Sequence, residues 1–98
     1  MISTHELKLY PVLFLDVATG HKKAVLCKND GSFKVGDGLT VKEVERWSNG
    51  YIGETGNEVY AHITHIQTCD DYPDGLEEGY AMLSINVYMT KILDNEMD

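Results

Sequence analysis

The chain has 98 residues, of which 43% are hydrophobic, a size and composition that suit one globular domain with one core. Its formal net charge of -8 argues against a general affinity for long duplex nucleic acid. No apolar run approaches the ~20 residues needed to span a bilayer, and the first residues lack the basic-then-apolar order of a signal peptide. We therefore expect a cytoplasmic protein without membrane contact, with a single domain at 1–98, a core at about 5–87 and a tail at 88–98.

Positive charge is concentrated in the first part of the sequence. Residues 1–37 carry five lysines against four carboxylates, a net charge of +1, whereas residues 38–98 carry three cations against twelve carboxylates, a net charge of -9. Four of the lysines fall between Gly20 and Asp37, around one short apolar run and several turn residues. A locally cationic pocket on an acidic body favours a short or compact anion as its ligand.

The first predicted elements are a strand, a helix and a second strand. Apolar and polar residues alternate over 5–10, the period of a half-buried strand. Pro11 ends this strand and opens an apolar segment that runs to Thr19, and Gly20 follows it, so we predict a short helix at 11–19. The continuous apolar run at 24–27 then predicts a buried strand.

The middle of the chain predicts a hairpin. Residues 39–47 alternate as a third strand, and the Ser-Asn-Gly sequence at 48–50 is a strong turn signal. The short segment 51–52 is either a returning strand or part of a loop tip, and we predict a flexible polar stretch at 53–57. The next clear strand covers 58–68.

The last part of the chain predicts an acidic surface loop at 69–79 and a core strand at 80–87. A terminal helical turn is possible in the tail around Met89, Ile92 and Leu93. Five strands with short links and only one clear helix indicate an α+β fold in which β dominates. We expect a small, mainly antiparallel barrel or strongly curved sheet, capped by the helix that follows the first strand.

Four segments stand in a characteristic order, HELKLYP, GHKKAVLCKND, FKVGD and GLEEGYAMLSI. In order and spacing they resemble the ASCH domains of the PUA-like superfamily, in particular a small bacterial and phage-borne branch of unknown function. The resemblance covers roughly residues 5–86. It implies a PUA-like β-barrel with a helix beside its cleft, and an association with RNA binding or modified-nucleoside chemistry.

The cleft motif of that family is only partly retained. Its Gly-x-Lys-x-x-Glu-x-Arg pattern falls on Gly20, Lys22, Val25 and Cys27, so the glutamate and the arginine are replaced. Related single-domain amidohydrolases carry a threonine, proposed as the nucleophile, where this chain has Val25. Valine supplies neither a nucleophile nor a transferable proton, so an enzyme is disfavoured. If the side of the strand that carries Val25 and Cys27 lines the cleft, the cleft is apolar there.

The candidate ligand-binding residues are polar groups of this motif and its surroundings. They are Lys8, Lys22, Lys23, Lys28, Asn29 and Asp30. Lys22 would bind an anion or, in an enzyme, act as a catalytic lysine; the alternative is a solvated lysine after a helix. For Asn29 and Asp30 the alternative is turn formation through side-chain hydrogen bonds to the backbone.

A metal site is not expected, and no cofactor is indicated. His62, His65 and Cys69 are of the types that bind zinc, but residues three apart in a strand point to opposite faces unless a bulge intervenes. His5 and His21 lie near the two ends of the opening strand-helix unit, where they either meet in the cleft or form a surface pair.

Three functional hypotheses follow. The first is a binding module that holds a nucleotide, a modified nucleoside or a short single-stranded RNA near Lys22, Lys28 and Asn29. The second is a small amidohydrolase acting on a modified nucleoside, which needs Glu77 or Glu78 close to Lys22. The third is an acidic protein-interaction module of a phage or mobile element, favoured by the net charge of -9 over residues 38–98.

Overall fold

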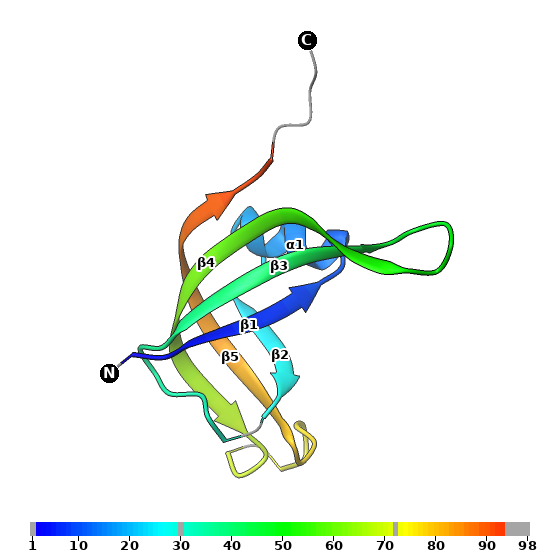
Figure 1. Ribbon diagram of the computed structural model, residues 1–98. Helices are drawn as coiled ribbons and strands as arrows, with labels where there is room; N and C mark the ends of the chain where they lie inside the picture. Colours follow the sequence, from blue (N-terminus) through cyan, green and yellow to red (C-terminus); the bar gives the residue numbers. More distant parts are fainter. Residues whose placement is uncertain (1, 30, 72, 94–98) are drawn as a thin grey trace.

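In the described residues the fold is a five-stranded sheet that curls into a half-barrel, with one short helix (Figure 1). The computed structural model describes residues 2–29, 31–71 and 73–93. Its elements in chain order are β1 (Thr4–Leu9), α1 (Pro11–Ala18), β2 (Ala24–Lys28), β3 (Gly38–Arg46), β4 (Ile52–Thr68) and β5 (Tyr80–Lys91). The β-dominant domain with a helix after its first strand is therefore confirmed.

The strand order explains why the barrel stays open. The order is β1-β3-β4-β5-β2, so β1 and β2 are the two edges of the sheet. The pairs β3–β4, β4–β5 and β2–β5 are antiparallel, as expected, whereas β1 and β3 are parallel. Parallel neighbours need a crossover connection, and here the chain between them contains α1 and β2.

Helix α1 closes the core against the sheet. Pro11 starts the helix, where a missing N–H costs nothing, and Gly20 adopts a φ of 86° just beyond its end. Phe14 and Val17 are the buried residues of the helix. They join a single cluster with residues of β2 to β5: Val25, Leu39, Val41, Val59, Ala61, Ile63, Ala81, Leu83 and Ile85. No helix in the described part of the chain has the length and hydropathy needed to cross a lipid bilayer.

The expected flexible stretch at 53–57 was wrong, because these residues belong to β4. Contacts from β3 and the turn hold them in the strand. The indole of Trp47 covers Gly53 so closely that an added Cβ would lie 2.6 Å from its Cζ2 atom. The Glu43 carboxylate accepts hydrogen bonds from Thr55 Oγ1 at 2.7 Å and from Asn57 Nδ2 at 2.9 Å. The resulting β3–β4 hairpin projects from the body of the domain (Figure 1).

The expected helical turn near the C-terminus was also wrong. β5 continues to Lys91, and Met89 pairs with Tyr60 in the longer β4. Leu93 follows the strand and donates its backbone N–H to Asn57 Oδ1 at 2.7 Å. The ordered fold therefore extends beyond residue 87, and the last five residues lie outside the described part of the chain.

Replacing a core leucine tests this packing. Leu83→Ala removes a fully buried side chain of β5, so we expect the free energy of unfolding to fall by about 2–5 kcal/mol. Leu15→Ala makes the same chemical change on the exposed side of α1 and should cost less than about 0.5 kcal/mol. Urea unfolding followed by circular dichroism measures both values. Equal losses would contradict the assignment of the core.

Candidate binding cleft

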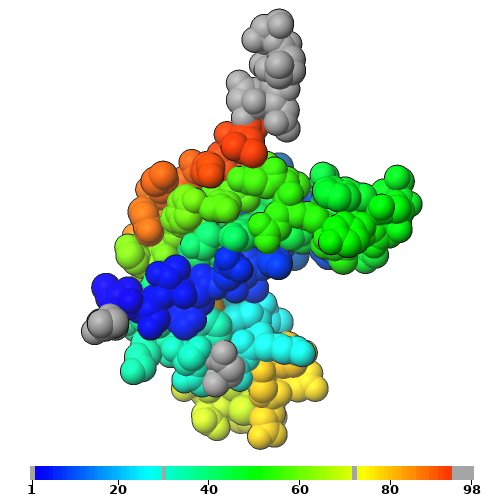
Figure 2. Space-filling model, in the orientation of Figure 1, coloured from blue at the N-terminus to red at the C-terminus, as the bar shows by residue number. Residues whose placement is uncertain are grey.

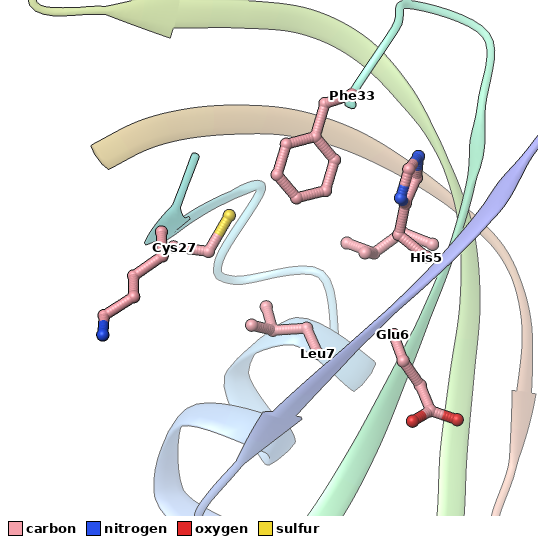
Figure 3. Close-up of a pocket in the computed structure, with 7 residues that line it drawn as sticks. His5, Glu6, Leu7, Cys27 and Phe33 are labelled. Atoms are coloured by element: carbon pink, nitrogen blue, oxygen red, sulfur yellow. The ribbon is translucent and has the colours of Figure 1, made fainter. Parts of the chain in front are cut away.

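The candidate site is a cleft of about 350 Å³ between the two edge strands, β1 and β2. Figure 3 shows Leu7, Cys27 and Phe33 directed into this hollow, whereas the carboxylate of Glu6 points away from it. The lining residues come from both edge strands, from the loop before β3 and from β3: His5, Glu6, Leu7, Cys27, Lys28, Phe33 and Leu39. The cleft thus combines apolar side chains with a small number of polar groups, as ligand sites commonly do.

A buried carboxylate fixes the histidine of the cleft. Asp37 is only 4% exposed, and its Oδ2 atom lies 2.8 Å from His5 Nε2. The same side chain accepts the backbone N–H groups of Lys34 at 3.1 Å and Ser3 at 3.4 Å. An ionised carboxylate only accepts hydrogen bonds, so His5 Nε2 carries the proton at this contact.

These contacts keep Asp37 charged. The hydrogen bond from His5 lowers the pKa of Asp37 below its ordinary value of 3.8, burial opposes this change, and the two backbone N–H groups add to it. The imidazole is held from a second side by Phe33, whose ring centroid lies 4.6 Å away at an angle of 56°. The cleft therefore presents an imidazole and a phenyl ring in fixed positions.

The open edge of β2 adds main-chain groups to this wall of the cleft. Ile85 donates its N–H to the carbonyl of Lys23 at 3.0 Å, and bonded and non-bonded pairs alternate along an antiparallel ladder. Leu26 and Lys28 occupy non-bonded positions, so their N–H and C=O groups point away from β5 toward the open edge. Lys28 therefore lines the cleft from the rim of the sheet.

The same reasoning applies to β1 on the opposite wall. Gly38 donates its N–H to the carbonyl of Ser3 at 2.9 Å, which places the backbone groups of the odd-numbered β1 residues toward β3. The N–H and C=O of Glu6 consequently face the open edge. Its carboxylate instead binds Lys42 Nζ at 2.8 Å on the outer face of the sheet, and this hydrogen bond lowers the pKa of Glu6.

The lysines of the partly retained motif are separated in space. Lys28 lies at the cleft, whereas Lys22 and Lys23 line a second pocket of about 180 Å³ at the other end of β2, beside the end of α1. The motif position Val25 is 1% exposed within the core, and Cys27 lies on the cleft wall. The strand face that carries these two residues therefore points inward, as its alternation indicates.

The other candidate ligand-binding residues lie elsewhere. Lys8 Nζ is 3.7 Å from Glu54 Oε2 on the outer face of the sheet. Asn29 Oδ1 accepts the N–H of Gly31 at 3.0 Å, which is the turn interaction considered as its alternative. Asp30 lies outside the described residues.

Reasoning from sequence missed Phe33 as a cleft residue and Asp37 as the buried partner of His5. The available signal was their position in the FKVGD segment, which contributes to the family resemblance. The suggested meeting of His5 and His21 does not form. His5 contacts Asp37, and His21 Nδ1 lies 2.9 Å from Thr19 Oγ1 at the end of α1.

A bulge changes the arrangement of the two histidines in β4. The register shifts between Ile63 and His65, so His62 pairs with Asn86 and His65 with Ser84, and both histidines lie on the outer face. His62 stacks on Tyr88 with ring centroids 4.6 Å apart. The described residues contain no group of three or more histidine, cysteine, aspartate or glutamate side chains that could hold a metal ion.

Comparison with known sequences places the chain in a family. Residues 4–85 match the model described as "Domain of unknown function (DUF3850)". The chain belongs to this family. The match begins in β1 and ends within β5, so all the elements that line the cleft lie within the DUF3850 domain. No curated protein matches the chain.

The Asp37 contact predicts a pH-dependent stability of this DUF3850 domain. The pKa of Asp37 is lower in the folded chain than in the unfolded chain. Its contribution to the free energy of unfolding is therefore fully present at a pH above the pKa of the unfolded chain. This contribution is lost as the pH falls through the pKa of the folded chain. Asp37→Asn should therefore lower the free energy of unfolding at about pH 7, and the difference from wild type should shrink as the pH falls below about 4.

Urea unfolding at a series of pH values measures this difference. Asp74→Asn is the matched control, because Asp74 is an exposed carboxylate in the 69–79 loop. A difference between wild type and Asp37→Asn that stays constant with pH would mean that the charge of Asp37 does not stabilise the fold.

Proposed function

We propose that this DUF3850 domain is a PUA-like, ASCH-type binding module whose cleft holds a nucleotide, a modified nucleoside or a short single-stranded RNA. The observation that carries the proposal is the combination of groups in the cleft. Phe33 offers an aromatic ring on which a base can stack, and Lys28 offers a cation at the rim of the cleft for a phosphate. The volume of about 350 Å³ is within the range of small-molecule sites.

Main-chain groups support recognition of a base. Glu6 and Lys28 line the two walls and direct N–H donors and C=O acceptors toward the open edges. A base carries both donors and acceptors on its edges, so these groups can pair with it without any further side chain. The ordered segments that resemble ASCH domains, together with a helix that follows the first strand of a curled sheet, support the same family assignment.

Electrostatics limits the size of the ligand. The chain carries a net charge of -8, and Glu6 and Glu54 lie on the outer face of the sheet, paired with lysines. A nucleotide or a few linked nucleotides can enter a local site beside Lys28 without passing along a long negative surface. A duplex needs an extended basic track, for which eight cations against sixteen carboxylates are unsuited.

The amidohydrolase hypothesis has less support than the binding module, because the groups that hydrolysis requires do not lie together. The amidohydrolase hypothesis needs a glutamate beside Lys22. Glu77 instead lines a third pocket with Leu26 and Tyr80, on the outer face of the sheet and toward the end of β2 that is opposite to Lys22. Val25, at the position of the family nucleophile, is buried in the core. We therefore propose binding without turnover.

A titration with nucleosides, nucleoside monophosphates and short oligouridylates tests the proposal. We expect NMR amide shifts concentrated at His5, Cys27 and Lys28. Phe33→Leu should weaken binding roughly fivefold to 150-fold, because base stacking on an aromatic ring contributes about 1–3 kcal/mol. Lys28→Ala should weaken the binding of nucleoside monophosphates more than the binding of nucleosides, because only the monophosphates carry the charge that this lysine contacts.

Lys91→Ala is the matched control, since it removes an exposed lysine at the end of β5. Lys22→Ala distinguishes the two pockets at the ends of β2. Loss of affinity in Lys22→Ala and not in Lys28→Ala would move the site to the pocket beside α1. An absence of shifts with every probe would refute the nucleotide-binding proposal.

A further inference from the structure

We propose that the open edge of β2 is a docking site for an extended protein segment that carries apolar and basic side chains on the same face. Three features meet at this strand: main-chain groups that point away from β5, an apolar pocket on the outer face, and a loop rich in carboxylates. Each feature selects a different property of the partner. The site does not depend on the nucleotide-binding proposal, because its pocket lies on the outer face of β2.

The first feature is the ladder of donors and acceptors on β2. β2 is the last strand of the sheet order, and its only sheet partner among the described residues is β5. Leu26 and Lys28 direct their N–H and C=O groups outward from the edge, and both residues are exposed. An exposed strand edge is a template on which an extended peptide adds as a further strand.

The second feature is an apolar pocket of about 410 Å³ beside this edge. Its apolar wall consists of Leu26, Leu76 and Tyr80. Leu26 is 53% exposed, and its cross-strand partner Met82 is 38% exposed, so the outer face carries large apolar side chains next to an open edge. Because side chains alternate along a strand, every second residue of a bound peptide would lie on this face and one could enter the pocket.

The third feature is the charge of the loop that borders the pocket. Residues 69–79 carry five carboxylates and no lysine or arginine. Gly75 and Glu77 from this loop line the same pocket as Leu26. Figure 2 shows the surface of β2 (cyan) next to this loop (yellow). Lysine or arginine on the peptide residues beside the pocket would therefore be attracted.

Charge also selects among the possible occupants. A single-stranded RNA that lay across the outer pocket would bring its phosphates to a loop with five carboxylates and would be repelled there. A basic, extended protein segment satisfies the edge, the pocket and the loop together.

A panel of short capped peptides tests the proposal. In each peptide, serine occupies every second position. The positions between carry lysine and one kind of apolar residue, which is valine, leucine or phenylalanine. The apolar and basic side chains therefore share one face of the extended peptide. We expect at least one peptide to bind the full chain with NMR amide shifts centred on Leu26 and Lys28. N-methylation of the amides that face β2 should weaken it at least tenfold, because it removes the ladder donors and leaves the side chains unchanged.

Variants of the domain identify the contributing surfaces. Leu26→Ala should weaken peptide binding about tenfold, because it removes one wall of the pocket. The double variant Glu77→Gln with Glu78→Gln should weaken peptide binding and reduce the salt dependence of the affinity. The double variant Glu45→Gln with Glu54→Gln makes the same charge change on the β3–β4 hairpin and should bind like wild type.

Four outcomes would overturn the proposal. The first is that no peptide binds, and the second is that the N-methylated peptide binds as tightly as the unmodified one. The third is binding that depends on lysine content alone and disappears at moderate salt. The fourth is self-association through β2, detected by sedimentation. The nucleotide titration uses different probes and different variants, so the two proposals can fail separately.

Discussion

The arrangement of the cleft depends on the hydrogen bonds of Asp37. Its side chain joins His5 in β1 to the backbone of Lys34 and Ser3, and its carbonyl accepts the N–H of Ile63 in β4 at 2.8 Å. Strand β1, the loop before β3 and strand β4 thus meet at one residue. Since a buried charge is tolerated only with several hydrogen bonds, these segments must keep their relative positions while Asp37 stays ionised.

The second constraint is the incomplete closure of the sheet. α1 follows β1 directly and packs against β3 and β5, and the chain then enters β2 at the far edge. The two edges therefore border a gap that no strand of the described residues fills, and the main-chain groups of Glu6 and Lys28 face it. A closed barrel would satisfy these groups internally and would have no cleft at this place.

Local pattern predicted the elements, while contacts between distant residues decided what it missed. The alternation in β1 and β5 and the Pro11 and Gly20 signals around α1 depend on neighbouring residues, so they could be read directly. Gly53 and Asn57 belong to β4 because Trp47 and Glu43 contact that segment across the hairpin. Likewise, the cleft could not be assembled from the lysine spacing, since its central pair, His5 and Asp37, is separated by 32 positions. Which lysines meet is decided by the path of β2, which carries Lys22 and Lys28 to opposite ends.

β2 connects the two proposed sites physically. The backbone of Lys28 faces the open edge and lines the cleft, while Leu26 contributes its backbone to the same edge and its side chain to the outer pocket. A strand added to β2 therefore uses main-chain groups that also border the cleft, and its inward-facing side chains must share the space beside Cys27. Binding of a peptide and binding of a nucleotide then affect each other by the same factor in both directions, because coupling free energy is reciprocal. Small inward-facing residues would leave room for the base, and large ones would exclude it, so the sequence of the partner would decide the sign of the coupling.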